Sequence, residues 1–316
     1  MLARLKYILI FCLLGLAIVP VRAENSMTYI YNAPESALDH RYDYQWEILR
    51  TALDKTKDKY GGYLMQKSLP MNEKRQTNEL VKGSGKITVM HLGTSQAFEK
   101  ALIPIRIPVD KNLSGYMVYL IRKDQQQRFS SVKTLDDLRG FSIGQGADWL
   151  DVNILRHNGF NVVGGSNYDG LFHMLIKKRF DAFQRSAAEI LDEYDQRKKD
   201  LPDLHIEQDL LVYYPLPMYF WFSKTETGRR LADRAREGMF MMIEDGSYDA
   251  IFTTYNQMQK ETGRAAPIRR PLITQLAPTS FMVMDESHKA AGTGDAASAT
   301  ETGNERGRAQ FFRDIL

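Results

Sequence analysis

Arg185 and Glu189 are the charged pair best placed to bind an ionic ligand, because they follow the predicted strand 180–184. Open α/β sheets place their ligands at the carboxyl ends of their strands. The planar guanidinium of arginine can hold a carboxylate through two parallel hydrogen bonds. The competing interpretation is a salt bridge from Arg185 to Glu189, one helical turn later, so both roles stay open for this pair.

A glycine-containing turn joins a predicted strand to a predicted helix and includes Gly144, Gly146, Asp148 and Trp149. Free backbone N–H groups at such a helix start can hold an anion, and Trp149 can cover a ligand. The alternatives are a plain turn with Asp148 as the helix N-cap and a core position for Trp149. A dinucleotide-binding motif is not indicated, because Trp149 occupies the position of its third glycine.

Polar residues at the ends of two predicted inner strands are further candidates to contact a ligand. Thr94 and Ser95 offer hydroxyl groups after the strand 86–92, and His91 lies near the end of that strand. Asn32 ends the first strand of the chain. The competing role of Thr94 and Ser95 is ordinary loop capping. We predict that these four residues face a cleft.

The usual residue patterns of hydrolases and metalloenzymes are missing from the sequence. The six histidines show no HxxH or HExxH spacing, so we expect no bound metal. There is no Gly-x-Ser-x-Gly motif and no Walker loop, and the single cysteine, Cys12, lies in an N-terminal apolar run. We therefore expect a protein without catalytic activity and without a cofactor. An enzyme would need an acid or base in its cleft, and the candidates are Glu189, Asp151 and His91.

The first 23 residues have the pattern of a secretory signal peptide. Arg4 and Lys6 precede an apolar run that is too short to span a bilayer, and Val21 and Ala23 suit signal peptidase. Cleavage after Ala23 removes three basic residues and no acidic one, so the formal net charge falls from +3 to zero. No polybasic tract remains to bind nucleic acid or an anionic membrane. We expect the mature chain in the periplasm without membrane insertion, and an uncleaved N-terminal anchor is the alternative.

Predicted strands and helices alternate along most of the chain, which is typical of βαβ units and of a parallel sheet. We therefore predict an α/β fold in which each lobe is a mixed, mainly parallel sheet flanked by helices. Asn72 is expected to start one helix, which ends at Gly83. The predicted strands are 27–31, 61–69, 86–92, 116–121, 141–146, 161–165, 180–184 and 218–223. The predicted helices are 42–57, 72–81, 134–140, 148–157, 168–177, 186–197, 227–244 and 247–258.

Two irregular, proline-containing stretches, 107–115 and 213–218, flank the middle of the chain. They predict a lobe of residues 114–213 inserted into a second lobe made of 24–113 and 214–267. The two crossings between the lobes would then act as a hinge.

The alternating pattern ends after about Pro267. Residues 268–316 are expected to form a tail that is disordered from about residue 285. Its Ala, Gly, Thr, Ser and charged residues bury too little apolar surface to order the chain.

Five segments together resemble the type II periplasmic solute-binding proteins, and within them the extracellular solute-binding family 3 group, over roughly residues 27–260. In particular, the chain looks like stand-alone members with Arg-Phe-Asp-x-Phe-x-Arg followed by a Glu-containing helix. The resemblance implies a two-lobed, hinge-bending fold that clamps a small polar ligand and delivers it to an inner-membrane permease or a sensor. We expect a monomer. The segments are LPMNEKRQTNELVKG, EKALIPIRIPVDKNLSGYMVYLIRK, TLDDLRGFSIGQGADWLD, YDGLFHMLIKKRFDAFQRSAAEI and EDGSYDAIFTTY.

One departure from the family concerns the ligand carboxylate. Amino-acid binders of this group usually follow the strand corresponding to 86–92 with Thr-x-x-Arg, whose arginine grips that carboxylate. Here the segment 94–99 reads Thr-Ser-Gln-Ala-Phe-Glu, without arginine, which puts an α-amino acid ligand in doubt. Arg75 and Arg106 are possible replacements, although each is expected to be solvated or paired with an acid.

Three functions therefore compete on this sequence. The first is a solute receptor for transport or sensing, the second a protein-interaction module that kept the fold and lost the ligand. The third is an enzyme on the same fold, such as a dehydratase of a cyclic acid or a lyase of cell-wall glycan. An intact cleft with converging polar side chains favours the receptor, whereas a collapsed apolar one favours the interaction module.

Overall fold

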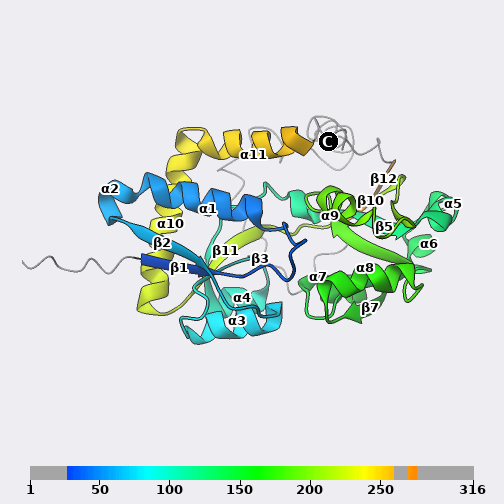
Figure 1. Cartoon of the computed structure of the whole chain (residues 1–316), viewed down its shortest axis with the longest axis horizontal. Helices are drawn as coiled ribbons and strands as arrows, with labels where there is room; N and C mark the ends of the chain where they lie inside the picture. The colour runs from blue at the N-terminus through cyan, green and yellow to red at the C-terminus, as the bar shows by residue number, and fades with distance from the viewer. Residues whose placement is uncertain (1–26, 260–269, 276–316) are drawn as a thin grey trace, which may run out of the picture.

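Two groups of β-strands, each with its own helices, lie side by side along the longest axis of the molecule (Figure 1). The computed structural model describes residues 27–259 and 270–275. The predicted signal peptide, residues 1–23, and the tail from about residue 285 lie outside the described residues. None of the helices in the described ranges is both long and apolar enough to cross a membrane.

We call the lobe predicted from residues 24–113 and 214–267 lobe 1, and we call the inserted lobe lobe 2. Lobe 1 contains two small sheets. In one, β1 (Met27–Tyr31) runs parallel to β2 (Tyr63–Lys67). In the other, β11 (Met218–Ser223) lies between β3 (Val89–Gly93) and β4 (Leu102–Ile105) and is antiparallel to both. The helices of this lobe are α1 (Asp43–Lys55), α2 (Lys57–Tyr60), α3 (Glu73–Lys82), α4 (Gln96–Ala101), α10 (Glu226–Glu244) and α11 (Ser247–Gln259).

The period-two alternation of β11 explains why helices cover both faces of lobe 1. Phe220 and Phe222 point into a core shared with α1, α10 and α11. Tyr219 and Trp221 point the other way, into a core that includes side chains of α3 and α4. In Figure 1, α1 and α11 accordingly lie on one side of these strands, and α3 and α4 on the other.

Lobe 2 contains a single seven-stranded sheet in the order β12-β10-β5-β8-β6-β7, with β9 paired to β5. Its strands are β5 (Tyr116–Arg122), β6 (Ser142–Gly146), β7 (Asn161–Gly165), β8 (Ala182–Ser186), β9 (Leu204–Ile206), β10 (Leu210–Tyr213) and β12 (Arg270–Gln275). Its helices are α5 (Gln126–Ser130), α6 (Leu135–Arg139), α7 (Leu150–His157), α8 (Tyr168–Ile176) and α9 (Ile190–Arg197), with short 3-10 turns η1 (Leu113–Gly115) and η2 (Lys123–Gln125).

Side chains of β5 divide the interior of lobe 2 into two cores. Met117, Tyr119 and Ile121 pack with residues of α5, α6 and α7. Val118 and Leu120 pack with residues of α8 and α9. A strand that buries both of its faces reads as a continuous apolar run, which is the pattern seen in this segment.

The mixed α/β architecture with two lobes is confirmed. Parallel pairing holds for β1 with β2 and for β6 with both β7 and β8. The antiparallel pairs are made by β5 and β11, which follow the two crossings between the lobes. Parallel neighbours need a crossover connection within one sheet, and a strand that enters from the other lobe does not have one. The sheets therefore contain more antiparallel pairing than the alternating pattern predicted.

The predicted helix start at Asn72 is confirmed in detail. The Asn72 side chain accepts a hydrogen bond from the backbone N–H of Arg75 at 3.0 Å. The helix ends at Gly83, whose positive φ of 62° is the left-handed conformation that glycine tolerates at a C-cap.

One strand of the sheet comes from the segment that was expected to be a tail. Residues Arg270–Gln275 form β12, which pairs in parallel with β10 at the edge of the sheet in lobe 2. Pro271 lies within this strand, and proline is tolerated only where no ladder hydrogen bond is needed, as at an edge. The exact lobe boundaries given above stay a prediction.

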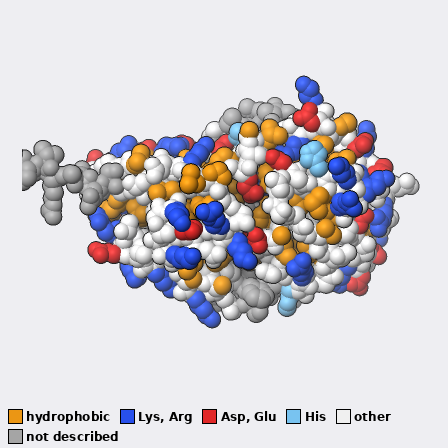
Figure 2. Space-filling model, turned by 60° about the horizontal axis from the view of Figure 1, so that its bottom comes forward, with side chains coloured by type: hydrophobic (Ala, Val, Ile, Leu, Met, Phe, Trp, Pro, Cys, Tyr) orange, Lys and Arg blue, Asp and Glu red, His pale blue; other side chains and the backbone are white. Residues whose placement is uncertain are grey.

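On the face shown in Figure 2, lysine and arginine side chains are scattered over both lobes and lie among acidic, apolar and uncharged polar ones.

Candidate functional site

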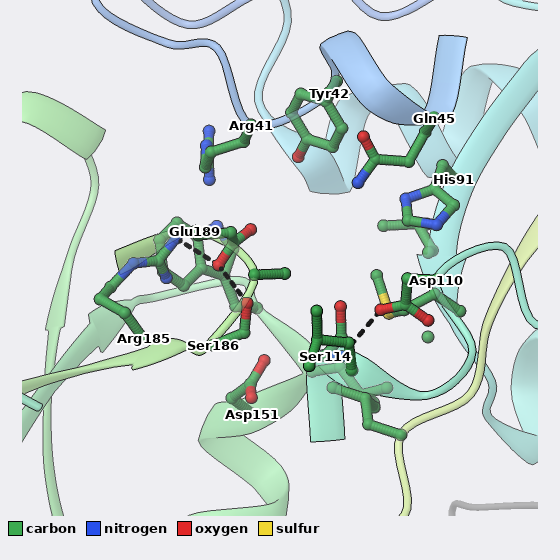
Figure 3. A pocket seen from close by; sticks show the side chains of 18 of the residues that line it. Arg41, Tyr42, Gln45, His91, Asp110, Ser114, Asp151, Arg185, Ser186 and Glu189 are labelled. Atoms are coloured by element: carbon green, nitrogen blue, oxygen red, sulfur yellow. Dashed lines mark hydrogen bonds and ion pairs between the residues drawn. The ribbon is translucent and has the colours of Figure 1, made fainter. Parts of the chain in front are cut away.

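A cavity with an empty volume of about 1030 Å³, including solvent at its mouth, opens between the two lobes. Lobe 1 lines it from the loop before α1, from α1 itself and from the strand β3. Lobe 2 lines it from the ends of β6 and β8 and from the start of α7 (Figure 3). The polar side chains of the lining are Arg41, Tyr42, Tyr44, Gln45, Glu73, His91, Asp110, Ser114, Gln145, Asp151, Gln184, Arg185, Ser186, Glu189 and Tyr255.

Four of the ligand-binding candidates from the sequence line this cavity: His91, Trp149, Arg185 and Glu189. Gly146 and Asp148 line an adjoining pocket of about 330 Å³, to which Trp149 also contributes.

Asn32, Thr94 and Ser95 are buried but do not belong to the lining of either pocket. Ser95 caps α4, because its Oγ accepts a hydrogen bond from the N–H of Phe98 at 3.2 Å. Thr94 donates to Glu99 at 3.4 Å. The ordinary capping role is therefore seen for Ser95, whereas the Thr94 hydroxyl is bonded to the Glu99 side chain.

The Arg185 guanidinium is held by two carboxylates of the protein itself. Its Nη2 donates to Glu189 at 2.8 Å, which is the i,i+4 salt bridge considered above (Figure 3). Its Nε and Nη2 also donate to the two carboxylate oxygens of Glu193, each at 2.7 Å. Ser186 donates to Glu189 at 3.1 Å and fixes that side chain. Arg185 is only 5% exposed, so this buried pairing is strong.

Packing against Trp149 explains why position 146 is a glycine. A Cβ at Gly146 would collide with the indole ring of Trp149. Helix α7 begins at Leu150, and its N-cap is Trp149 without a side-chain cap. The interpretation of Asp148 as the N-cap is therefore wrong, because the helix starts at Leu150, two residues after the predicted bound.

Arg41 lines the cavity but was not predicted from the sequence. It comes from the loop before α1 in lobe 1, and its Nε donates to Asp39 at 2.7 Å. Its Nη2 donates to Glu35 at 2.9 Å. Its guanidinium also lies over the rings of two lobe 2 residues, 3.9 Å from the centroid of Tyr168 and 5.5 Å from that of Trp149.

Gln45, Glu73, Asp110 and Gln145 also line the cavity and were not predicted. Gln145 precedes Gly146 at the carboxyl end of β6, so the strand-end rule used for Arg185 would have found it. Glu73 is the first residue of α3 and carried no local signal beyond its place in the first helical turn. Arg75 is exposed, and Arg106 forms a surface ion pair with Glu99.

Burial controls the protonation of the acids around the cavity. Desolvation raises the pKa of Glu73 to about 8, with the neighbouring Asp151 carboxylate as the next cause. Desolvation also raises the pKa of Asp110 and that of Asp151, although hydrogen bonds to each carboxylate oppose it. Desolvation lowers the pKa of His91 to about 3, so its imidazole is neutral at pH 7.

Several buried polar atoms at the cavity lack a hydrogen-bond partner among the described residues. They are the side-chain oxygen of Gln45, the side-chain oxygen of Gln145 and both ring nitrogens of His91. Gln45 and His91 belong to lobe 1, whereas Gln145 belongs to lobe 2. Buried polar groups in proteins are nearly always paired, so these atoms mark places where a bound molecule would complete the hydrogen bonding.

The candidate acids and bases of an enzyme, Glu189, Asp151 and His91, line the same cavity. Asp151 accepts a hydrogen bond from the hydroxyl of Tyr214. Within the described ranges, no group of three or more His, Cys, Asp or Glu side chains is arranged to hold a metal ion.

Comparison with known proteins identifies the fold. No protein-family model matches the sequence, and no curated protein matches it. Among solved structures, an ancestral arginine-binding protein bound to arginine superposes with a TM-score of 0.53 at 18% identity, covering 72% of this chain and 98% of that one. The fold is that of a type II periplasmic binding protein.

Two further matches show how widely this fold is shared. An amino acid ABC transporter substrate-binding protein from Streptococcus pneumoniae, bound to L-arginine, has a TM-score of 0.53 at 12% identity, covering 72% of this chain and 93% of that one. The GluR0 ligand-binding core from Nostoc punctiforme, in complex with L-glutamate, has a TM-score of 0.51 at 12% identity, covering 72% of this chain and 98% of that one. The expected resemblance to amino-acid-binding periplasmic proteins is confirmed at the level of the fold.

Proposed function

We propose that this protein is a solute receptor that closes its two lobes around a small polar molecule, without catalysing a reaction. The observation that carries the proposal is the set of unpartnered polar atoms of Gln45, His91 and Gln145, which reach one cavity from both lobes. A ligand that hydrogen-bonds to side chains of both lobes connects the two lobes, so its binding favours closure. The similar solved proteins are themselves described as binding arginine or glutamate in the same fold.

The open, polar-lined cavity favours the receptor over a ligand-free interaction module, for which a collapsed apolar cleft was expected. We further propose that the chain is exported to the periplasm by residues 1–23, acts as a monomer and delivers its solute to an inner-membrane permease. Two of the similar proteins are described as belonging to amino acid ABC transporters, which supports the permease as the partner.

A thermal-shift screen of the purified chain tests this proposal. The panel contains amino acids, dicarboxylates, sugar acids and polyamines. A ligand at a hundred times its dissociation constant adds about 2.7 kcal/mol to the free energy of unfolding, which raises the melting temperature by about 5 to 10 °C.

The hit should be weakened in Gln145→Ala and retained in Gln208→Ala, whose side chain is exposed on the same lobe. A flat response across the panel would contradict the receptor and promote the interaction module.

A further inference from the structure

Both arginines that line the cavity are already neutralised by the protein. Arg185 is paired with Glu189 and Glu193, and Arg41 with Asp39 and Glu35. These two are the only Lys or Arg side chains in the described lining. The described cavity wall therefore offers no uncommitted cation to hold the carboxylate of a ligand.

The remaining charged side chains of the lining are the acids Glu73, Asp110 and Asp151. None of the three forms an ion pair with another described residue. Asp151 accepts a hydrogen bond from Tyr214, and Asp110 accepts from the backbone N–H groups of Asn112 at 3.1 Å and Ser114 at 2.8 Å. These donors are uncharged, so no described cation is paired with these three carboxyl groups.

The raised pKa values of these three acids agree with the lack of an ion-pair partner. A carboxyl that is buried beside a cation normally titrates below its usual range, because the cation stabilises the ionised form. Here desolvation outweighs the opposing charges of Arg41 at Glu73 and of Arg185 at Asp151, and Asp151 further disfavours the carboxylate form of Glu73. A positive charge placed among them would remove that penalty.

The uncharged groups of the cavity also favour a molecule that donates hydrogen bonds. The free side-chain oxygens of Gln45 and Gln145 are acceptors only, and neutral His91 offers one acceptor nitrogen. Tyr42, Tyr44 and Trp149 add aromatic rings to the wall, and such rings attract cations. Ammonium and guanidinium groups carry positive charge and only donors.

Resting on the proposed receptor function, we propose that the ligand is a small organic cation with amine or guanidinium groups and without a carboxylate. Asp151 and Glu73 form one anchor for its positive charge, and Asp110 forms another from lobe 1. Gln45, Gln145 and His91 accept its remaining N–H groups.

Isothermal titration calorimetry with agmatine and L-arginine tests this ligand class, because the two molecules differ only by the carboxylate. We expect agmatine to bind at least about tenfold more tightly, since the arginine carboxylate would be buried without a partner. Putrescine and ornithine form a second pair with the same difference.

Two isosteric variants test the anchor. Asp151→Asn and Glu73→Gln should each weaken agmatine binding by about tenfold or more, whereas Asp136→Asn, an exposed carboxylate on the same lobe, should leave it unchanged. Melting temperatures confirm that the variants fold.

Proton release gives an independent readout. Titrations at pH 7 in buffers of different ionisation enthalpy should show release of up to about one proton on agmatine binding, lost in Glu73→Gln, because the cation favours ionised Glu73.

The contrary results distinguish a failure of the ligand class from a failure of the receptor function. Arginine binding as tightly as agmatine, or a dicarboxylate binding in place of both, would overturn the carboxylate-free cation as the ligand and leave the receptor intact. Agmatine binding that is unchanged in both variants would overturn the assigned anchor. The absence of any binding across these probes and the wider panel would overturn the class and the receptor together.

Discussion

The guanidinium of Arg41 lies 3.9 Å from the centroid of the Tyr168 ring, and these two residues belong to opposite lobes. The ion pairs of Arg41 with Asp39 and Glu35 fix its side chain in lobe 1. The Tyr168 hydroxyl in turn donates to Glu193 at 2.7 Å within lobe 2. The contact therefore connects two hydrogen-bonded networks across the cleft and favours the arrangement of the lobes seen in this structure.

Replacing Arg41 with leucine should shift the ligand-free chain toward an open form. A cation–π contact of this kind contributes about 0.5 to 2 kcal/mol, which is enough to change the populations of two states several-fold. Small-angle X-ray scattering should show a larger radius of gyration for Arg41→Leu than for wild type. Arg50→Leu, which removes an exposed arginine of α1, is the control and should not change it. Equal radii for all three proteins would mean that Arg41 does not hold the lobes together.

Replacing Arg185 with leucine should lower the free energy of unfolding by about 3 to 5 kcal/mol. The loss arises because Glu193, itself 2% exposed, is left buried without its guanidinium partner. Urea denaturation measures the change. Arg106→Leu removes a surface ion pair and should cost less than about 1 kcal/mol. A similar small loss for Arg185→Leu would show that the buried pair is not needed for the fold.

His91 should make the protein less stable in acid. Its pKa is about 3 in the folded chain and 6.5 as a free side chain, so the unfolded chain binds a proton first. Its contribution to stability is therefore complete above pH 6.5 and is lost as the pH falls toward 3, by at most about 1.4 kcal/mol per pH unit. Urea denaturation at pH 7 and pH 4.5 should show a smaller loss for His91→Gln than for wild type. The exposed His157→Gln should behave like wild type, and the same behaviour in His91→Gln would contradict the prediction.

Replacing Gly238 with alanine should destabilise lobe 1 by about 1 to 3 kcal/mol. Gly238 lies in α10 where this helix crosses α1, and a Cβ there would collide with the backbone carbonyl of Ala52. A backbone carbonyl cannot move aside as a flexible side chain can, so the helices would separate. Thermal unfolding compares this variant with Gly62→Ala, where an added Cβ meets nothing within 4 Å. Equal melting temperatures would mean that the crossing tolerates the extra methyl group.

The fold could be predicted from local signals because those signals agree with the packing. The apolar run of β5 buries both faces, and the Asn72 cap and the Gly83 end bound α3 as expected. The strand 270–275 was not foreseen, because a short segment containing proline has no alternation to recognise and depends on β10 as its template.

The candidate site could be predicted only in part, because its contacts are not local. Sequence spacing gave the pair Arg185 and Glu189 but left its role open. The decisive partner is Glu193, eight residues away, which reaches Arg185 only because α9 folds back beside the end of β8. Arg41 and Glu73 come from segments with no pattern of their own, and the packing of two lobes brings them to the cavity. No single-sequence rule relates residues across such a boundary.

The position of Trp149 gives the molecule an optical property. Of its three tryptophans, Trp46 and Trp221 are buried in the cores of lobe 1. Trp149 alone stands at the boundary between the lobes, with the guanidinium carbons of Arg185 and Arg41 at 4.9 Å and 5.5 Å from its ring centroid. Indole emission responds to nearby charge and to water, so separation of Arg41 from this ring changes the surroundings of one fluorophore while the other two stay constant. The chain thus contains an intrinsic fluorescent reporter of lobe movement that needs no attached dye.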